Sequence, residues 1–140
     1  MAGEITHPLP YASWESRGYW EGAGRGELVI QRCEECGTTQ HKPRGLCVTC
    51  LSDHVEHVVA SGRGHVHTFT VTHQNQMPAF RDACPYVLAY VELEEGPRLL
   101  TNIVGCEPAD VRIGLPVVAD FAASGRDDGE AFAVPRFRPA

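Results

Sequence analysis

Two cysteine pairs, Cys33-x2-Cys36 and Cys47-x2-Cys50, constrain this 140-residue chain more than any other feature of its sequence. Each pair places two sulfurs on one tight turn, and two facing turns offer four thiolates at the corners of a tetrahedron. Gly37 follows the first pair and supplies the backbone freedom that such a turn needs. Soft thiolates favour zinc or iron over hard cations, and four cysteines leave no position open for a catalytic water. We therefore predict a structural zinc ion bound by these four cysteines.

Other interpretations of the cysteines stay open. Disulfides are disfavoured in a reducing compartment, and a redox CxxC motif is typically single and near a βαβ pattern. Iron in the four-thiolate site would instead indicate a rubredoxin-like electron carrier, which leaves the rest of the chain unexplained. His41 lies between the pairs and can replace a cysteine as ligand, but we expect it at the surface. Cys84 and Cys106 match no ligand spacing and are expected to be buried small residues.

The charge and hydropathy of the chain exclude some classes of protein. Twelve basic and eighteen acidic residues give a formal charge of −6, which argues against a protein that coats nucleic acid by charge alone. No apolar run approaches the roughly 18 residues of a membrane helix. The first ten residues, MAGEITHPLP, contain neither a basic start nor an apolar stretch typical of a secretory signal. The expected compartment is therefore the cytoplasm.

The residues before the first cysteine predict short helical pieces. Ser13 is a candidate N-cap, and several glycines between residues 18 and 26 prevent one long helix. Trp14, Tyr19 and Trp20 are concentrated here. They either pack against the rest of the domain or form a surface for a protein partner, where aromatic anchors are enriched. We assign residues 1–28 to this helical segment and residues 29–55 to a metal ribbon, which is too small for a core of its own.

From about residue 56 the sequence predicts short strands. Residues 65–73 alternate, with His67, Phe69 and Val71 expected on one face. Further strands are expected over residues 86–93, 98–105, 116–121 and 131–137, separated by turns at 96–97, 114–116 and 124–129. Five strands without a convincing helix between them predict a small β-barrel over residues 56–140. The expected fold class is therefore mainly β.

Several segments together resemble a known family. They are QRCEECGTTQHKPRGLCVTC, ASGRGHVHTFTVTH, PYVLAYVELEEGPRLLTNIVG, IGLPVVADF and VPRFRPA. Over nearly the whole chain, from about Trp14 to Phe137, they resemble the family that joins a rubredoxin-like zinc ribbon to an OB-fold barrel. The resemblance implies a small accessory subunit that binds a thiolase-fold enzyme or a hydratase acting on coenzyme A thioesters. It implies a scaffold or channel for an acyl-CoA in carbon–carbon bond cleavage or formation, in a hetero-oligomer with paired copies.

The sequence itself shows no catalytic constellation. Cys84 precedes Pro85 with no histidine patterned beside it, and neither a G-x-S-x-G elbow nor a phosphate-binding loop is present. Seven histidines, including the pairs 54/57 and 65/67, have no carboxylate placed convincingly beside them and are interpreted as surface or interface residues. We therefore expect no activity from this chain alone.

Coenzyme A needs basic groups for its phosphates and a narrow apolar groove with polar partners for its pantetheine arm. The candidates by residue type are Arg44, Arg63, Arg81 and Arg98 for phosphate, and Phe69, Phe80 and Asn102 for a groove. The basic, aromatic C-terminal segment forms a last strand or a docking tail; Arg136 and Phe137 join Trp14, Tyr19 and Trp20 as the predicted partner interface. A single-stranded nucleic-acid module, which would need a local patch around Arg32, Lys42 and Arg44, remains the alternative.

Overall fold

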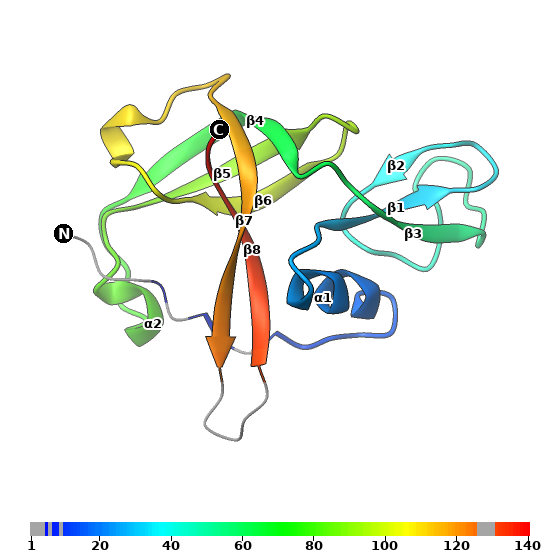
Figure 1. Ribbon diagram of the computed structural model, residues 1–140, viewed down its shortest axis with the longest axis horizontal. Coiled ribbons are helices and arrows are strands. Elements are labelled where there is room, and N and C mark those ends of the chain that lie inside the picture. Colours follow the sequence, from blue (N-terminus) through cyan, green and yellow to red (C-terminus); the bar gives the residue numbers. More distant parts are fainter. Residues whose placement is uncertain (1–4, 6, 9, 126–130) are drawn as a thin grey trace.

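The chain forms a small ribbon sheet beside a β-barrel in the computed structural model, which describes residues 5, 7–8, 10–125 and 131–140 (Figure 1). The ribbon contains β1 (Val29–Cys33), β2 (Thr39–Gln40) and β3 (Val55–Val59) in the order β2-β1-β3. Both pairings are antiparallel. The boundary expected between residues 55 and 56 falls within β3, which pairs along its length with β1 as part of the ribbon.

Five strands close the barrel, and this confirms the predicted mainly β fold. They are β4 (Arg63–Thr72), β5 (Tyr86–Leu93), β6 (Arg98–Ile103), β7 (Pro116–Gly125) and β8 (Ala131–Pro139), in the order β4-β5-β6-β8-β7. The β4–β7 pairing completes the ring. The β6–β8 contact is parallel and consists of one residue pair, Ile103 and Phe137. The predicted turn over residues 124–129 lies mostly outside the described residues.

Short helices cover the ends of the sheets. Helix α1 (Arg17–Gly24) lies against β1 and β8, whereas α2 (Pro78–Arg81) and the 3₁₀ turn η1 (Pro108–Asp110) connect strands of the barrel. Ser16 occupies the N-cap position of α1, and Ser13, the candidate N-cap of a turn through Trp14, directly precedes a turn over residues 14–16. The two serine hydroxyls lie 3.0 Å apart. No helix among the described residues is long and apolar enough to cross a membrane.

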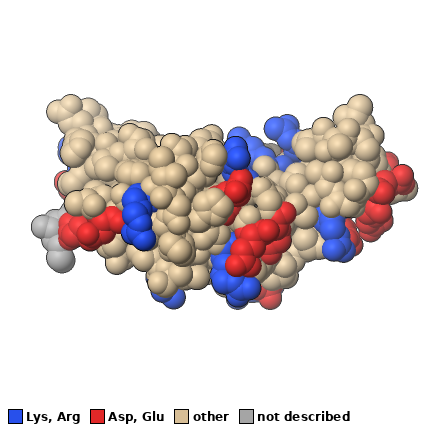
Figure 2. All heavy atoms as spheres, turned by 90° about the horizontal axis from the view of Figure 1, so that it is seen from above, with Lys and Arg blue, Asp and Glu red and all other residues tan. Residues whose placement is uncertain are grey.

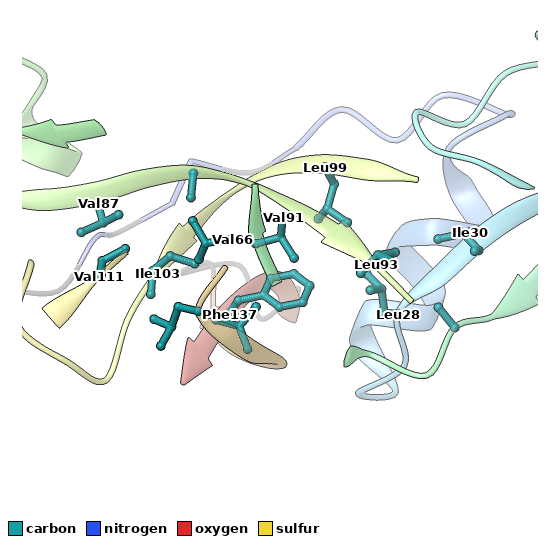
Figure 3. Close-up of a cluster of buried hydrophobic side chains, with 14 residues drawn as sticks. Leu28, Ile30, Val66, Val87, Val91, Leu93, Leu99, Ile103, Val111 and Phe137 are labelled. Atoms are coloured by element: carbon teal, nitrogen blue, oxygen red, sulfur yellow. The ribbon is translucent and has the colours of Figure 1, made fainter. Parts of the chain in front are cut away.

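One hydrophobic core joins the two sheets. Leu28 and Ile30, from the ribbon side, belong to the same buried cluster as the inward residues of the barrel (Figure 3). Phe137 lies within this cluster and has no exposed surface. The prediction that Phe137 contacts a partner is therefore corrected, because its ring fills the barrel. The shared core explains how a ribbon too small to fold around its own interior is held in place.

A bulge in β4 changes the predicted face of one side chain. The pairing with β5 shifts between Val66 and Thr68. An extra residue in a strand shifts its alternation by one. Val66 is fully buried, and Phe69 and Val71 pack against the same core, so these three share the inner face. The sequence wrongly placed His67 with Phe69 and Val71, because period-two alternation does not reveal a bulge.

Candidate metal centre and barrel groove

The four predicted cysteines come together at one end of the ribbon. Their sulfur atoms all lie within 4.8 Å of one another. Cys33 Sγ lies 3.5 Å from Cys50 Sγ, and Cys36 Sγ lies 3.6 Å from Cys47 Sγ. A tetrahedron with metal–sulfur bonds of about 2.3 Å has edges of about 3.8 Å. The donor set and its spacing therefore fit a four-coordinate metal ion.

The two cysteine turns are built alike. The backbone N–H of Gly37 donates to the carbonyl of Cys33 at 3.0 Å, and that of Leu51 donates to the carbonyl of Cys47 at 3.0 Å. Gly37 and Leu51 have φ values of +75° and +63°, respectively. The left-handed region suits glycine and disfavours leucine. The geometry of the cysteine turn therefore imposes a positive φ at both positions, even where the residue is leucine.

Two buried glutamines hold the loop that carries the second cysteine pair. Gln31 accepts a hydrogen bond from the Arg44 N–H at 2.8 Å and donates to the Arg44 carbonyl at 2.9 Å. Gln40 Nε2 donates to Gln31 Oε1 at 2.9 Å and to the Leu46 carbonyl at 3.2 Å, and Gln40 Oε1 accepts from the Val48 N–H at 2.9 Å. Both glutamines are 4 % exposed or less. This network fixes the second cysteine turn relative to β1.

The thiols respond strongly to one another. Hydrogen bonds with the side chain and backbone of Thr38 lower the pKa of Cys36 to about 6. A backbone hydrogen bond at Ser52 lowers the pKa of Cys50, but the three neighbouring sulfurs and burial outweigh it and raise that pKa to about 12. Four crowded sulfurs resist ionising together, because each thiolate repels the next. A cation among them would remove this repulsion.

The aromatic residues before the ribbon occupy two different environments. Tyr19 packs against the Trp20 ring at 4.9 Å and the His41 ring at 5.3 Å, between α1 and the ribbon. Burial raises the pKa of Tyr19 to about 12. Trp14 is 75 % exposed, with one edge next to Gly45. Of the predicted aromatic anchors, Trp14 presents the largest free surface.

Two of the four arginines predicted to bind phosphate form ion pairs with glutamates. Arg63 Nε lies 3.1 Å from Glu94 Oε1, and Arg98 Nε lies 2.9 Å from Glu92 Oε1. These hydrogen-bonded pairs hold the pKa of both glutamates below the usual range. Figure 2 shows basic and acidic side chains interspersed on the visible face, with no single positive patch.

The other predicted coenzyme A residues are also scattered. Arg44 is exposed on the ribbon loop, Arg81 is exposed on α2, and Phe69 packs inside the barrel. Phe80, on α2, lies between the rings of His7 and Tyr86, at centroid distances of 6.3 and 5.9 Å. Asn102 alone among the seven lines a large cavity formed by described residues.

That cavity is an open groove of about 960 Å³ at the surface of the barrel, and it reaches the core residues Val87 and Ile103. Its walls come from the start of β5, the end of β6, η1, the outward faces of β7 and β8, and the N-terminal residues Ile5 and His7. Arg136, predicted as an interface residue, lies here with its Nε 2.9 Å from Asp120 Oδ2. The groove as a whole could not be predicted from the sequence, because its walls come from distant segments. The opposite charges of Asp120 and Arg136, on neighbouring strands, were the available signal.

Comparisons with known proteins match both the ribbon and the barrel to described domain families. Residues 20–56 match the family model of the ChsH2 rubredoxin-like zinc ribbon domain, and residues 57–122 match that of the ChsH2 C-terminal OB-fold domain. A "DUF35 domain-containing scaffold protein" of Methanocaldococcus jannaschii is 38% identical over 115 residues, which cover 80% of this chain and 81% of that protein. The chain belongs to the DUF35 family. The predicted family of zinc ribbon plus OB-fold proteins is thereby confirmed.

Other relatives of this DUF35 chain carry enzyme names. A probable enoyl-CoA hydratase alpha subunit of Thermomonospora curvata is 41% identical over 98% of the chain, which spans only 41% of that protein. A benzoylsuccinyl-CoA thiolase subunit of Geobacter metallireducens is 35% identical over 53% of this chain and 48% of that subunit. A solved chain of an "Ltp2-ChsH2(DUF35) aldolase" superposes with a TM-score of 0.82 at 40% identity, covering 94% of this chain and 98% of the other.

Proposed function

We propose that this chain is a non-catalytic accessory subunit that associates with a thiolase-like or hydratase enzyme and helps to bind or channel an acyl-CoA thioester. The observation that carries the proposal is the aldolase match, since almost all of both chains superposes. The relatives named as hydratase and thiolase subunits support the same class of partner. The acyl-CoA is proposed as the shared substrate because those relatives are named for coenzyme A thioesters. The proposed compartment is the cytoplasm, where the thiols stay reduced.

The proposed metal is one structural zinc ion held by Cys33, Cys36, Cys47 and Cys50. Zinc suits four thiolates and would link the two cysteine turns without redox chemistry. Elemental analysis of purified protein tests this assignment: we expect about one zinc per chain and no visible absorption. Stoichiometric iron with visible absorption would instead support the electron carrier.

The described residues provide no activated nucleophile near the groove. Cys106 is the thiol on its wall. Burial, followed by the charges of Asp110 and Glu107, raises the pKa of this thiol. A thiol with a raised pKa stays protonated and is a poor nucleophile at neutral pH. The chain's contribution is therefore binding and orientation, while the partner carries out the bond-making or bond-breaking step.

Co-expression with a candidate thiolase-like or hydratase enzyme tests the proposed association. We expect a complex that survives gel filtration and an enzyme whose activity falls at least tenfold without this chain. An enzyme that is fully active alone and forms no complex would refute the proposal. A second experiment measures binding of single-stranded oligonucleotides to this chain at low salt. Binding would support the nucleic-acid module instead.

A further inference from the structure

We propose that the barrel groove holds the neutral pantetheine arm of an acyl-CoA, and that the coenzyme A phosphates are bound outside this chain. This inference rests on the proposed function and adds the part of the ligand that this chain contacts. The arm carries two amides on an uncharged chain and ends in the thioester. The groove's size, lining and charge favour that arm over the nucleotide.

The size and lining of the groove suit a slender, partly apolar ligand. Its volume of about 960 Å³ lies within the range of small-molecule sites, roughly 300–1,000 Å³. Apolar residues from at least four segments line it, namely Ala83, Val87, Ile103, Val104 and Pro108, of which Val104 and Pro108 are the partly exposed ones. Such a wall can cover the methyl and methylene groups of the arm.

Two polar side chains in the wall suit the amides of the arm. Asn102 Nδ2 donates to the Val87 carbonyl at 3.0 Å, which fixes the orientation of the Asn102 amide. His7 Nε2 is buried and has no hydrogen-bond partner among the described residues. A buried polar atom without a partner is costly, so a ligand amide at this position would be favourable. Burial and the charge of Arg136 lower the pKa of His7, which keeps its ring neutral at pH 7.

The charges around the groove exclude a phosphate-binding role. Arg136 is neutralised by Asp120 at 2.9 Å. Arg138 is the other arginine of the wall among the described residues, and the same wall carries two further carboxylates, Glu107 and Asp110. A site for phosphates needs a surplus of cationic donors. The described lining of the groove has no surplus of cationic donors for phosphates. The uncharged pantetheine arm, in contrast, is not repelled by the carboxylates of the groove.

Chemical-shift mapping on the full-length, zinc-loaded chain tests the inference. The probes are S-acetylpantetheine, acetyl-CoA and adenosine 3′,5′-bisphosphate, each at low and high salt. We expect the first two to bind with Kd values within about threefold of each other, to shift the amides of residues 87 and 102–106, and to be insensitive to salt. The bisphosphate should shift none of these amides. The inference is overturned by bisphosphate shifts in the groove, by a tenfold salt effect, or by no shift with either thioester at 5 mM.

Two substitutions to tryptophan locate the binding site. Cys106→Trp fills the groove and should weaken S-acetylpantetheine binding at least tenfold, whereas Leu100→Trp, on the exposed face of β6 outside the groove, should leave it unchanged. If Cys106→Trp fails to fold, Asn102→Leu replaces it, with a native-like spectrum required. Equal binding by wild type and a folded groove variant would refute the inference. Capture of the partner enzyme by the wild-type chain, measured separately, shows whether the proposed function still stands.

Discussion

Replacing Gln31 by leucine should weaken metal binding without touching a cysteine. Gln31 is 2 % exposed, and its side chain makes three hydrogen bonds, two with the Arg44 backbone and one with Gln40. Leucine fills a similar volume but leaves three polar atoms without this partner. A buried polar atom without a partner costs about 1–3 kcal/mol. The lower figure applies here because Arg44 is exposed and can reach water, and because Gln40 Nε2 keeps its bond to the Leu46 carbonyl. The expected cost is therefore about 3 kcal/mol.

This cost should appear in the metal affinity, because metal binding and folding of the ribbon are coupled. A cost of about 3 kcal/mol corresponds to roughly a hundredfold rise in the apparent Kd for zinc. Competition with a colorimetric zinc chelator measures that Kd. Gln74→Leu is the matched control, since Gln74 is exposed outside the ribbon. An affinity of Gln31→Leu within threefold of wild type would refute the reasoning that the glutamine network positions the second cysteine pair.

The remaining predictions concern single substitutions. Cys47→Ser should release the zinc and destabilise the ribbon; full zinc content in this variant would show that the ligand assignment is wrong. Leu51→Gly should raise the free energy of unfolding by about 0.5–1 kcal/mol in urea, because it relieves a φ of +63° at a side chain that is 72 % exposed; a loss of stability would contradict this. Burial, followed by the charge of the neighbouring lysine, lowers the pKa of His41 to about 4. The unfolded chain therefore binds the proton first, and the stability of wild type relative to His41→Phe should fall by about 1.4 kcal/mol from pH 7.5 to pH 5.5; parallel pH profiles would contradict the shift. Gly64→Ala should lower stability by about 1–3 kcal/mol because its Cβ would overlap a carbonyl of β5, whereas Gly24→Ala, with open space around it, should raise stability by up to about 1 kcal/mol in thermal melts.

The metal centre could be predicted from the sequence because the ligands of each pair lie close together along the chain. Two residues separate the cysteines of each pair, so the turn alone brings their sulfurs together. The barrel strands were also predicted, because inward side chains alternate along each strand. The β4 bulge was missed because one additional residue at His67 leaves no mark in residue type.

The groove and the ion pairs could not be predicted in the same way, because they depend on register. Arg98 and Glu92 lie directly opposite each other across the β5–β6 turn. A turn at residues 96–97 leaves that register open, so the sequence does not show that Arg98 is paired with Glu92 rather than free to bind phosphate. The groove joins His7, Tyr86 and Arg136, which no short motif connects. Such a surface emerges only when the barrel closes.

The short pairing between β6 and β8 is the position at which we expect the barrel to open locally. One residue pair, the bond from the Val104 N–H to the Phe137 carbonyl at 2.8 Å and the bond from the Thr101 hydroxyl to the Pro135 carbonyl at 3.4 Å connect the two strands there, whereas β7 and β8 pair over nine positions. Local opening is cheapest where the fewest bonds break, so amide hydrogen exchange should be fastest along this join. Because Ile103 and Val104 also line the groove, breathing of the barrel would widen it. Opening at this join would therefore ease entry of the pantetheine arm that we propose for the groove.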